Sequence, residues 1–136
     1  MVAERGVAQA ARMSARSPEE IHALIAAAFN ARDLDAFAAL HEQDATVRVP
    51  PDGRRVSGRD AIRAAVAPTL ALASSFRSDV VGKLEADGLA LTHARWTMIG
   101  SDGGERVELS GLGTVVSRRQ PDGSWRIALE TPLSPE

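Results

Sequence analysis

Residues 44–53 read DATVRVPPDG and mark the place where the predicted fold changes from helix to strand. Residues 46–49 alternate polar and apolar side chains, which is typical of a strand with one buried face. The prolines at 50 and 51 end this strand, because proline cannot donate a hydrogen bond to a sheet and favours a turn. A strand that ends so abruptly predicts a bend in the chain, with Val49 as the last side chain before it.

Two helices are predicted before this strand. Ser17, Pro18 and Glu20 form a helix start, since serine caps the helix, proline suits its first turn and glutamate follows three residues after the serine. The apolar face of the first helix consists of Ile21, Leu24, Ile25, Ala28 and Phe29. Asp33 caps a second, shorter helix that ends at His41. Its inward-facing residues are Leu34, Phe37 and Leu40.

A third helix is predicted after the strand, beginning at the sequence SGRD of residues 57–60. Its apolar face includes Ile62 and Val66, and Pro68 is expected to bend or end it. The pairs Arg54-Arg55 and Ser74-Ser75 are interpreted as loop residues.

The pattern changes to that of strands after residue 74. The predicted strands are 75–85, 89–100, 105–119 and 124–131, separated by turns that contain Asp-Gly. Helices followed by an antiparallel meander predict an α+β fold, with three N-terminal helices in the concave face of a curved, mixed, mostly antiparallel sheet. The space between the helices and the sheet is a natural pocket.

Size and composition exclude several classes of protein. The 136 residues suit one domain, expected at 17–132 after a flexible tail at 1–16. A net charge of −2 gives no field that attracts nucleic acid, and the absence of cysteine excludes a disulfide or a thiol nucleophile. The N-terminus lacks the apolar core of a signal peptide, and no apolar run is long enough for a membrane span. A cytoplasmic protein is therefore expected.

Four segments carry a resemblance to a known family: ARDLDAFAALHEQDATVRVP (31–50), VSGRDAIRAAV (56–66), ARWTMIG (94–100) and RRQPDGSWRIALETP (118–132). They resemble the nuclear transport factor 2-like superfamily, whose cone fold is shared by ketosteroid isomerase, scytalone dehydratase and the SnoaL polyketide cyclases. The last three segments are most similar to the small SnoaL-like branch that includes SgcJ-type proteins. The resemblance implies the cone fold, and for activity it is weak, since this fold hosts many functions.

The resemblance to ketosteroid isomerase also shows where the chain departs from that enzyme. It implies a general-base aspartate at Val49, an oxyanion-hole tyrosine at Ile25 and a protonated aspartate near Val115. Valine and isoleucine can neither take nor donate a proton, and the chain contains no tyrosine. Steroid isomerisation by that mechanism is therefore rejected.

Strand alternation indicates which residues face the pocket. On one strand these are Thr92, Ala94, Trp96 and Met98, and on the next Leu109, Gly111, Gly113 and Val115. The two glycines are expected to curve the sheet and open cavity space. On the last strand Arg126, Ala128 and Glu130 share the pocket face, opposite Trp125, Ile127 and Leu129. The predicted ligand-binding residues are Trp96, Thr92, Met98, Val49, Val115, Ile25, Phe29 and Val66.

Glu130 and His41 are the candidates for chemistry. The resemblance to SnoaL-like cyclases implies an acid or base at Glu130, and a carboxyl group in an apolar cone suits that role. Alternatively, Glu130 pairs with Arg126 or lies in solvent at the mouth. His41 either hydrogen-bonds a ligand, shares a proton with Glu130, or is a helix-terminal histidine favoured by the dipole.

Two functions remain open from the sequence. One is a cofactor-independent isomerase, cyclase or dehydratase that acts on an apolar, polyketide-like or cyclic metabolite by proton transfer. The other is a non-catalytic module that binds a small hydrophobic ligand or dimerises through its sheet, with His93 and Arg95 on the outer face. No metal site is expected, because His22, His41 and His93 lack the spacing of metal ligands.

Overall fold

Helices precede strands along the chain, as the hydrophobic periodicity predicts. The computed structural model describes residues 14–135, and within them lie three helices and six strands. The helices are α2 (Pro18–Ala31), α3 (Leu34–Ala39) and α4 (Arg59–Leu72). The strands are β1 (His41–Val49), β2 (Arg54–Ser57), β3 (Ala73–Ala86), β4 (Leu89–Asp102), β5 (Glu105–Arg119) and β6 (Trp125–Thr131).

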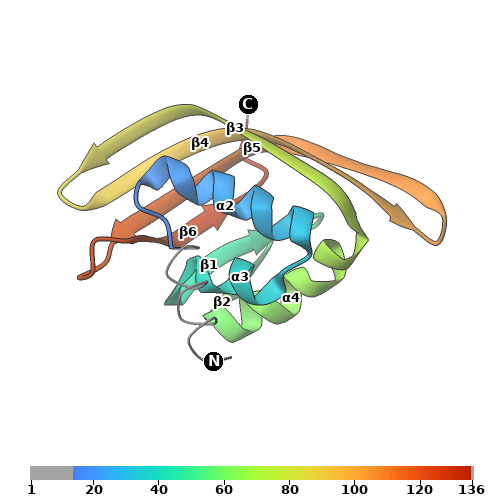
Figure 1. The fold of residues 1–136 in the computed structure, drawn as a ribbon, viewed down its shortest axis with the longest axis horizontal. Coiled ribbons are helices and arrows are strands. Elements are labelled where there is room, and N and C mark those ends of the chain that lie inside the picture. The colour runs from blue at the N-terminus through green and yellow to red at the C-terminus, as the bar shows by residue number, and fades with distance from the viewer. Residues whose placement is uncertain (1–13, 136) are drawn as a thin grey trace, which may run out of the picture.

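The six strands form one curved, mixed sheet in the order β2-β1-β6-β5-β4-β3. Strands β1 and β6 run parallel, and the other neighbours pair antiparallel. The sheet bends around the helices, which lie together on its concave side (Figure 1). The predicted α+β class and the mixed, mostly antiparallel sheet are confirmed.

The predicted caps begin the first two helices. The Ser17 hydroxyl accepts a hydrogen bond from the Glu20 backbone N–H at 3.2 Å, and the Asp33 carboxylate accepts one from Ala36 N–H at 3.0 Å. Between the helices, Arg32 takes the left-handed conformation at φ 52° and ends α2. These local contacts explain why the helix starts could be read directly from the sequence.

Three local predictions are wrong: the end of the second helix and the two residue pairs interpreted as loops. His41 does not end a helix: α3 stops at Ala39, and His41 begins β1, where it pairs with Ile127. Arg54 and Arg55 belong to strand β2 rather than a loop, because the Pro-Pro turn closes a hairpin in which Val49 pairs with Arg54.

Strand β3 likewise begins earlier than predicted and includes Ser74 and Ser75. Pro68 does not end α4, which continues to Leu72 and brings the buried Leu70 into the core. In both places tertiary packing overrides a local preference for a break.

The predicted tail lies mostly outside the described residues. Of its last residues, Ala15 is buried and forms an isolated bridge with Trp125, whose N–H donates to the Ala15 carbonyl at 2.9 Å. The domain boundary at residue 17 stays a prediction.

Strand β6 contains an irregularity that decides which side chains face inward. Along β5, Val116 pairs with Leu129 and Ser117 with Ile127, so Ala128 is an extra residue on β6, a β-bulge. The bulge resets the alternation. Ile127 is therefore fully buried, Leu129 is 51% exposed, and Glu130 again lies on the inner face beside Val115.

Candidate active site

A cavity lies between the helices and the concave face of the sheet. It offers about 90 Å³ to the centres of water-sized molecules, several times the space that one water needs. The lining residues come from all three helices and from strands β1, β3, β4, β5 and β6. They are His22, Ile25, Phe29, Phe37, Val47, Arg48, Val49, Pro50, Val66, Thr69, Phe76, Ser78, Ala94, Trp96, Met98, Leu109, Gly113, Val115, Glu130 and Pro132.

Most residues predicted from the sequence line this cavity. The predicted residues that do so are Ile25, Phe29, Val49, Val66, Trp96, Met98, Val115 and Glu130. Thr92 and His41 are fully buried behind the wall and do not line it. The isomerase resemblance implied two acids and a base at Val49, Ile25 and Val115. These three aliphatic side chains form part of the cavity wall.

Glu130 reaches the cavity through the bulge at Ala128, not through the regular alternation assumed from the sequence. The prediction that Arg126, Ala128 and Glu130 share one face is therefore wrong for the strand, although Glu130 itself lines the cavity. Its side chain is 14% exposed, and its Oε1 lies 3.6 Å from Nε2 of His41. Within residues 14–135, neither alternative describes Glu130, because it is paired with His41 instead of Arg126 and does not lie in solvent at the mouth.

His41 lies directly behind this carboxylate. Its Nε2 is 3.6 Å from Glu130 Oε1, which is too long for a hydrogen bond, and its side chain has no exposed surface. The Nδ1 atom lies 3.0 Å from the Phe37 carbonyl oxygen. A carbonyl can only accept, so Nδ1 carries a proton, and in that tautomer of an uncharged imidazole Nε2 carries the lone pair.

Arg59 fixes the backbone at His41. Its guanidinium donates two hydrogen bonds to the His41 carbonyl oxygen, from Nε at 3.1 Å and from Nη2 at 2.7 Å. The ring is therefore oriented by Phe37 and the main chain by Arg59, while Nε2 has no hydrogen-bond partner within residues 14–135. An unpaired buried nitrogen is costly, which makes the nearby Glu130 its natural proton partner.

Aromatic side chains form one wall of the cavity. The Phe76 ring stacks on Trp96 with centroids 5.6 Å apart and on Phe29 at 4.7 Å. The Trp96 indole N–H donates to the Pro132 carbonyl at 2.7 Å, which ties the segment after β6 to this wall.

The two glycines of β5 admit these neighbours. A Cβ at Gly113 would lie 3.4 Å from the Trp96 ring, and a Cβ at Gly111 would lie 2.6 Å from Leu133 Cδ2. Gly113 lines the cavity, but the space expected above both glycines is largely taken by Trp96 and Leu133.

His22 lines the cavity and was overlooked as a site residue. Its Nε2 lies 2.7 Å from the Thr92 hydroxyl, which in turn lies 3.5 Å from the Val115 carbonyl. Burial lowers the pKa of His22, an effect opposed by the charges of Glu130 and Glu19 and reinforced by His93. The sequence did contain a signal for this position. Residues 22, 25 and 29 have the spacing of one helical face, so His22 could be placed on the same face as the predicted cavity residues Ile25 and Phe29.

This lowered pKa predicts a pH-dependent stability. At pH values between 6.5, the ordinary pKa of histidine, and the lower pKa of His22 in the folded chain, the unfolded chain binds one more proton than the folded chain. The contribution of His22 to the free energy of unfolding is therefore fully present above pH 6.5 and falls on acidification. One proton sets the slope at about 1.4 kcal/mol per pH unit in that window. Urea unfolding between about pH 5 and pH 8 measures it, and His22→Phe should remove this slope. An equal slope in the variant contradicts the assignment.

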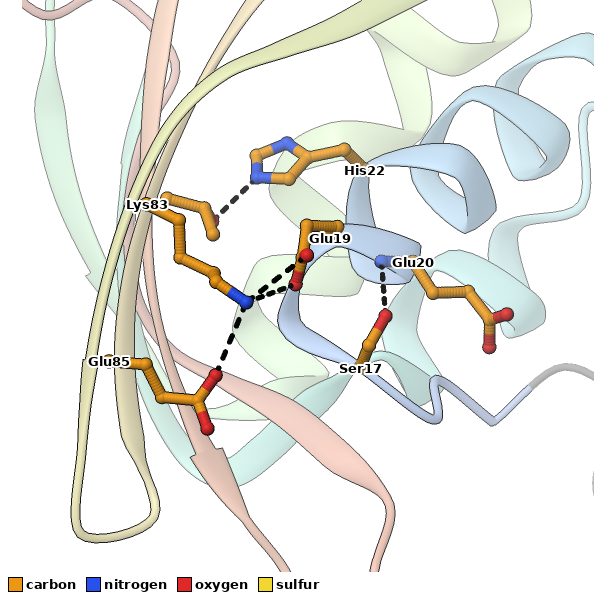
Figure 2. Close-up of polar contacts among 7 residues, drawn as sticks. Ser17, Glu19, Glu20, His22, Lys83 and Glu85 are labelled. Atoms are coloured by element: carbon orange, nitrogen blue, oxygen red, sulfur yellow. Dashed lines mark hydrogen bonds and ion pairs between the residues drawn. The ribbon is translucent and has the colours of Figure 1, made fainter.

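A surface ion pair holds the end of the β3–β4 hairpin over the start of α2. Lys83 Nζ lies 3.2 Å from both carboxylate oxygens of Glu19 and 3.4 Å from Glu85, as Figure 2 shows beside His22. The pKa of Lys83 is raised, mainly by its hydrogen bond to Glu19. The contact is exposed and contributes little to stability, but it lies next to the His22 end of the cavity.

Comparison with known proteins identifies the family. A sequence profile for the SnoaL-like domain matches residues 7–127, most of the chain. The chain belongs to the SnoaL-like domain family. No curated protein matches this SnoaL-like chain.

Solved structures share the fold of this SnoaL-like chain. A Thiobacillus denitrificans protein, provisionally named a calcium/calmodulin-dependent protein kinase type II association domain, is 27% identical with a TM-score of 0.67, covering 87% of this chain and 96% of that one. A provisionally named SnoaL-like polyketide cyclase of Shewanella denitrificans is 12% identical, with a TM-score of 0.62 and coverages of 86% and 90%.

A provisionally named dehydratase of the nuclear transport factor 2-like family from Streptomyces avermitilis is 16% identical, with a TM-score of 0.64 and coverages of 82% and 90%. At such identities the last two show the fold alone. Within residues 14–135 of this SnoaL-like chain, no helix is long and apolar enough to cross a membrane.

Proposed function

We propose that this SnoaL-like protein binds a small, largely apolar molecule in its cavity and transfers a proton on it through Glu130, without a cofactor. The observation that carries the proposal is the pairing of Glu130 with His41. Among the residues that line the cavity, Glu130 is the one carboxylate, and its Oε1 lies 3.6 Å from Nε2 of the fully buried His41 imidazole.

The arrangement supports general acid–base chemistry. A Glu130 oxygen accepts a proton from a C–H or O–H of the ligand, and the bonding electron pair stays on the ligand. His41 Nε2 stabilises the proton by sharing it with the carboxyl group. Returning the proton at a second atom gives an isomerisation or completes a cyclisation, and giving it to a departing hydroxyl releases water. The names of the Shewanella and Streptomyces proteins, cyclase and dehydratase, fit this range.

The size of the cavity restricts the ligand. An apolar cavity of about 150 Å³ accepts benzene, so roughly 90 Å³ with a partly open mouth suits a single ring rather than fused rings. The ketosteroid isomerase mechanism stays rejected, because Val49 and Ile25 line this cavity with no group that exchanges a proton.

A second candidate function is that of a non-catalytic binding or assembly module. The name of the Thiobacillus protein, an association domain, and its 27% identity favour it. Leu129, on the outer face of β6, is 51% exposed, and Leu133 just after that strand is 46% exposed. A homodimer through the sheet would cover Leu129. The sequence leads us to expect a cytoplasmic location, and we propose it with either function.

Binding of toluene tests the function common to both ligand-binding proposals. We expect saturable shifts of the NMR signals of the Met98 methyl group and the Trp96 indole N–H, because both residues line the cavity. The methyl signals of exposed Leu129 are the internal control and should not move. No saturable shift up to the solubility limit of toluene contradicts ligand binding, and a dimer by light scattering in that case favours assembly.

A further inference from the structure

The cavity presents a second polar group besides Glu130, and it comes from α2. His22 extends from the helix toward the sheet, where one ring nitrogen, Nε2, meets the Thr92 hydroxyl at 2.7 Å (Figure 2). That contact occupies Nε2 in either tautomer, since a hydroxyl can donate or accept.

The other ring nitrogen, Nδ1, is free to meet a ligand. It has no hydrogen-bond partner within the described residues. Within residues 14–135, two side-chain atoms are both unpartnered and sealed from solvent, His41 Nε2 and Ser117 Oγ. Nδ1 of His22 is not one of them, so it keeps some accessible surface. An unpartnered nitrogen that keeps accessible surface, on a ring that lines the cavity, borders the cavity itself.

Strand register places this nitrogen opposite Glu130. Thr92 on β4 pairs with Val115 on β5, and Val115 pairs with Glu130 on β6. All three side chains lie on the inner face, so His22, held by Thr92, and Glu130 stand on either side of Val115. Adjacent strands are about 5 Å apart, so two spacings, about 10 Å, separate Thr92 from Glu130, which leaves room for one small ring and its contacts at both ends.

We propose that His22 binds the polar group of the ligand, so that the protein selects an uncharged single-ring compound with one oxygen substituent, either a hydroxyl or a carbonyl. This inference rests on the proposed function and names the ligand class for the same cavity. Burial keeps the imidazole neutral near neutral pH, because the pKa of His22 is lowered. A neutral nitrogen facing the Glu130 side chain across Val115 suits an uncharged oxygen group better than a carboxylate ligand.

Phenol and toluene are matched probes of this inference. They have one ring and similar size, and only phenol offers a group that can hydrogen-bond Nδ1 in either tautomer. We expect the wild-type chain to bind phenol about tenfold more tightly than toluene, the effect of one well-placed hydrogen bond. His22→Phe keeps an aromatic ring, and it should abolish this preference while leaving the affinity for toluene within about twofold.

His93→Phe is the control variant, because it makes the same substitution at a histidine that does not line the cavity and whose Nδ1 lies 2.9 Å from the Thr114 hydroxyl. It should keep the preference for phenol. In the wild-type protein, phenol should shift the ¹⁵N signal of His22 Nδ1 and leave the ring signals of His93, on the outer face, unchanged. This measurement holds even if His22→Phe fails to fold.

Three results would overturn the inference. These are equal affinities of the wild type for phenol and toluene, loss of the preference in His93→Phe instead of His22→Phe, or an unmoved His22 signal at saturating phenol. Each leaves the proposed function intact, provided that toluene binds. Failure of toluene and phenol alike contradicts the proposed function itself.

Discussion

Glu130→Gln is expected to lower deuterium exchange from D₂O into the α-carbon of cyclohexanone by about 10²- to 10⁴-fold, the usual contribution of a general base. Glutamine has the shape of glutamate but cannot accept the proton. Cyclohexanone is a single ring with an exchangeable C–H beside a carbonyl, so it matches the size of the cavity and needs no knowledge of the natural substrate. Proton NMR follows the exchange directly.

The matched control is Glu42→Gln. Glu42 lies on β1, where its carboxylate accepts hydrogen bonds from Arg118 at 3.1 Å and Gln120 at 2.9 Å, and it does not line the cavity. This variant should exchange cyclohexanone at the wild-type rate. Equal rates for wild type and Glu130→Gln would remove Glu130 from the chemistry. A wild type that binds toluene but exchanges no deuterium would favour the binding module.

Ile127→Ala is expected to lower the free energy of unfolding by about 2–5 kcal/mol. Ile127 has no exposed surface and packs in the core on the inner face of β6. Truncation leaves a cavity beside His41, which pairs with Ile127 across the parallel strands. Urea unfolding measures the loss, and circular dichroism shows whether the variant remains folded.

Leu129→Ala tests the bulge on the same strand. Leu129 lies two residues from Ile127, and in a regular strand both would be equally buried. Because Ala128 is bulged, Leu129 is 51% exposed and its truncation should cost no more than about 0.5 kcal/mol. Comparable losses for the two variants would mean that β6 alternates regularly and that Glu130 is placed differently.

The strand faces of β4 and β5 could be predicted from the sequence because their pairing is uninterrupted. Every residue of β4, from Leu89 to Asp102, has a partner on β5. The alternation of inner and outer side chains is therefore unbroken on both strands, and it places Met98 and Val115 on the inner face. Strand β6 could not be predicted in the same way. It pairs with β1 on one side and β5 on the other, and a bulge that satisfies both neighbours depends on contacts distant in sequence.

The sequence predicts only part of the site, because it does not reveal long-range strand pairing. Glu130 follows from the family resemblance, and a regular alternation of β6 places it on the same inner face as the bulged strand does. His41 was placed at a helix end because Leu34, Phe37 and Leu40 suggest a helix up to that point, whereas strand pairing with Ile127 governs the structure. His22 was missed because a lone histidine on an apolar helical face is usually a core residue.

The place of β6 in the sheet has a consequence for biosynthesis. Strand β6 follows the other five described strands in the chain and inserts between β1 and β5, which belong to early and late parts of the described residues. A nascent polypeptide that has not yet released residues 125–131 from the ribosome therefore carries two open strand edges, a template for aggregation, and lacks Glu130. Emergence of β6 covers both open edges and delivers the proposed proton acceptor in a single event, so a chain that lacks residues 125–131 should not carry the proposed activity.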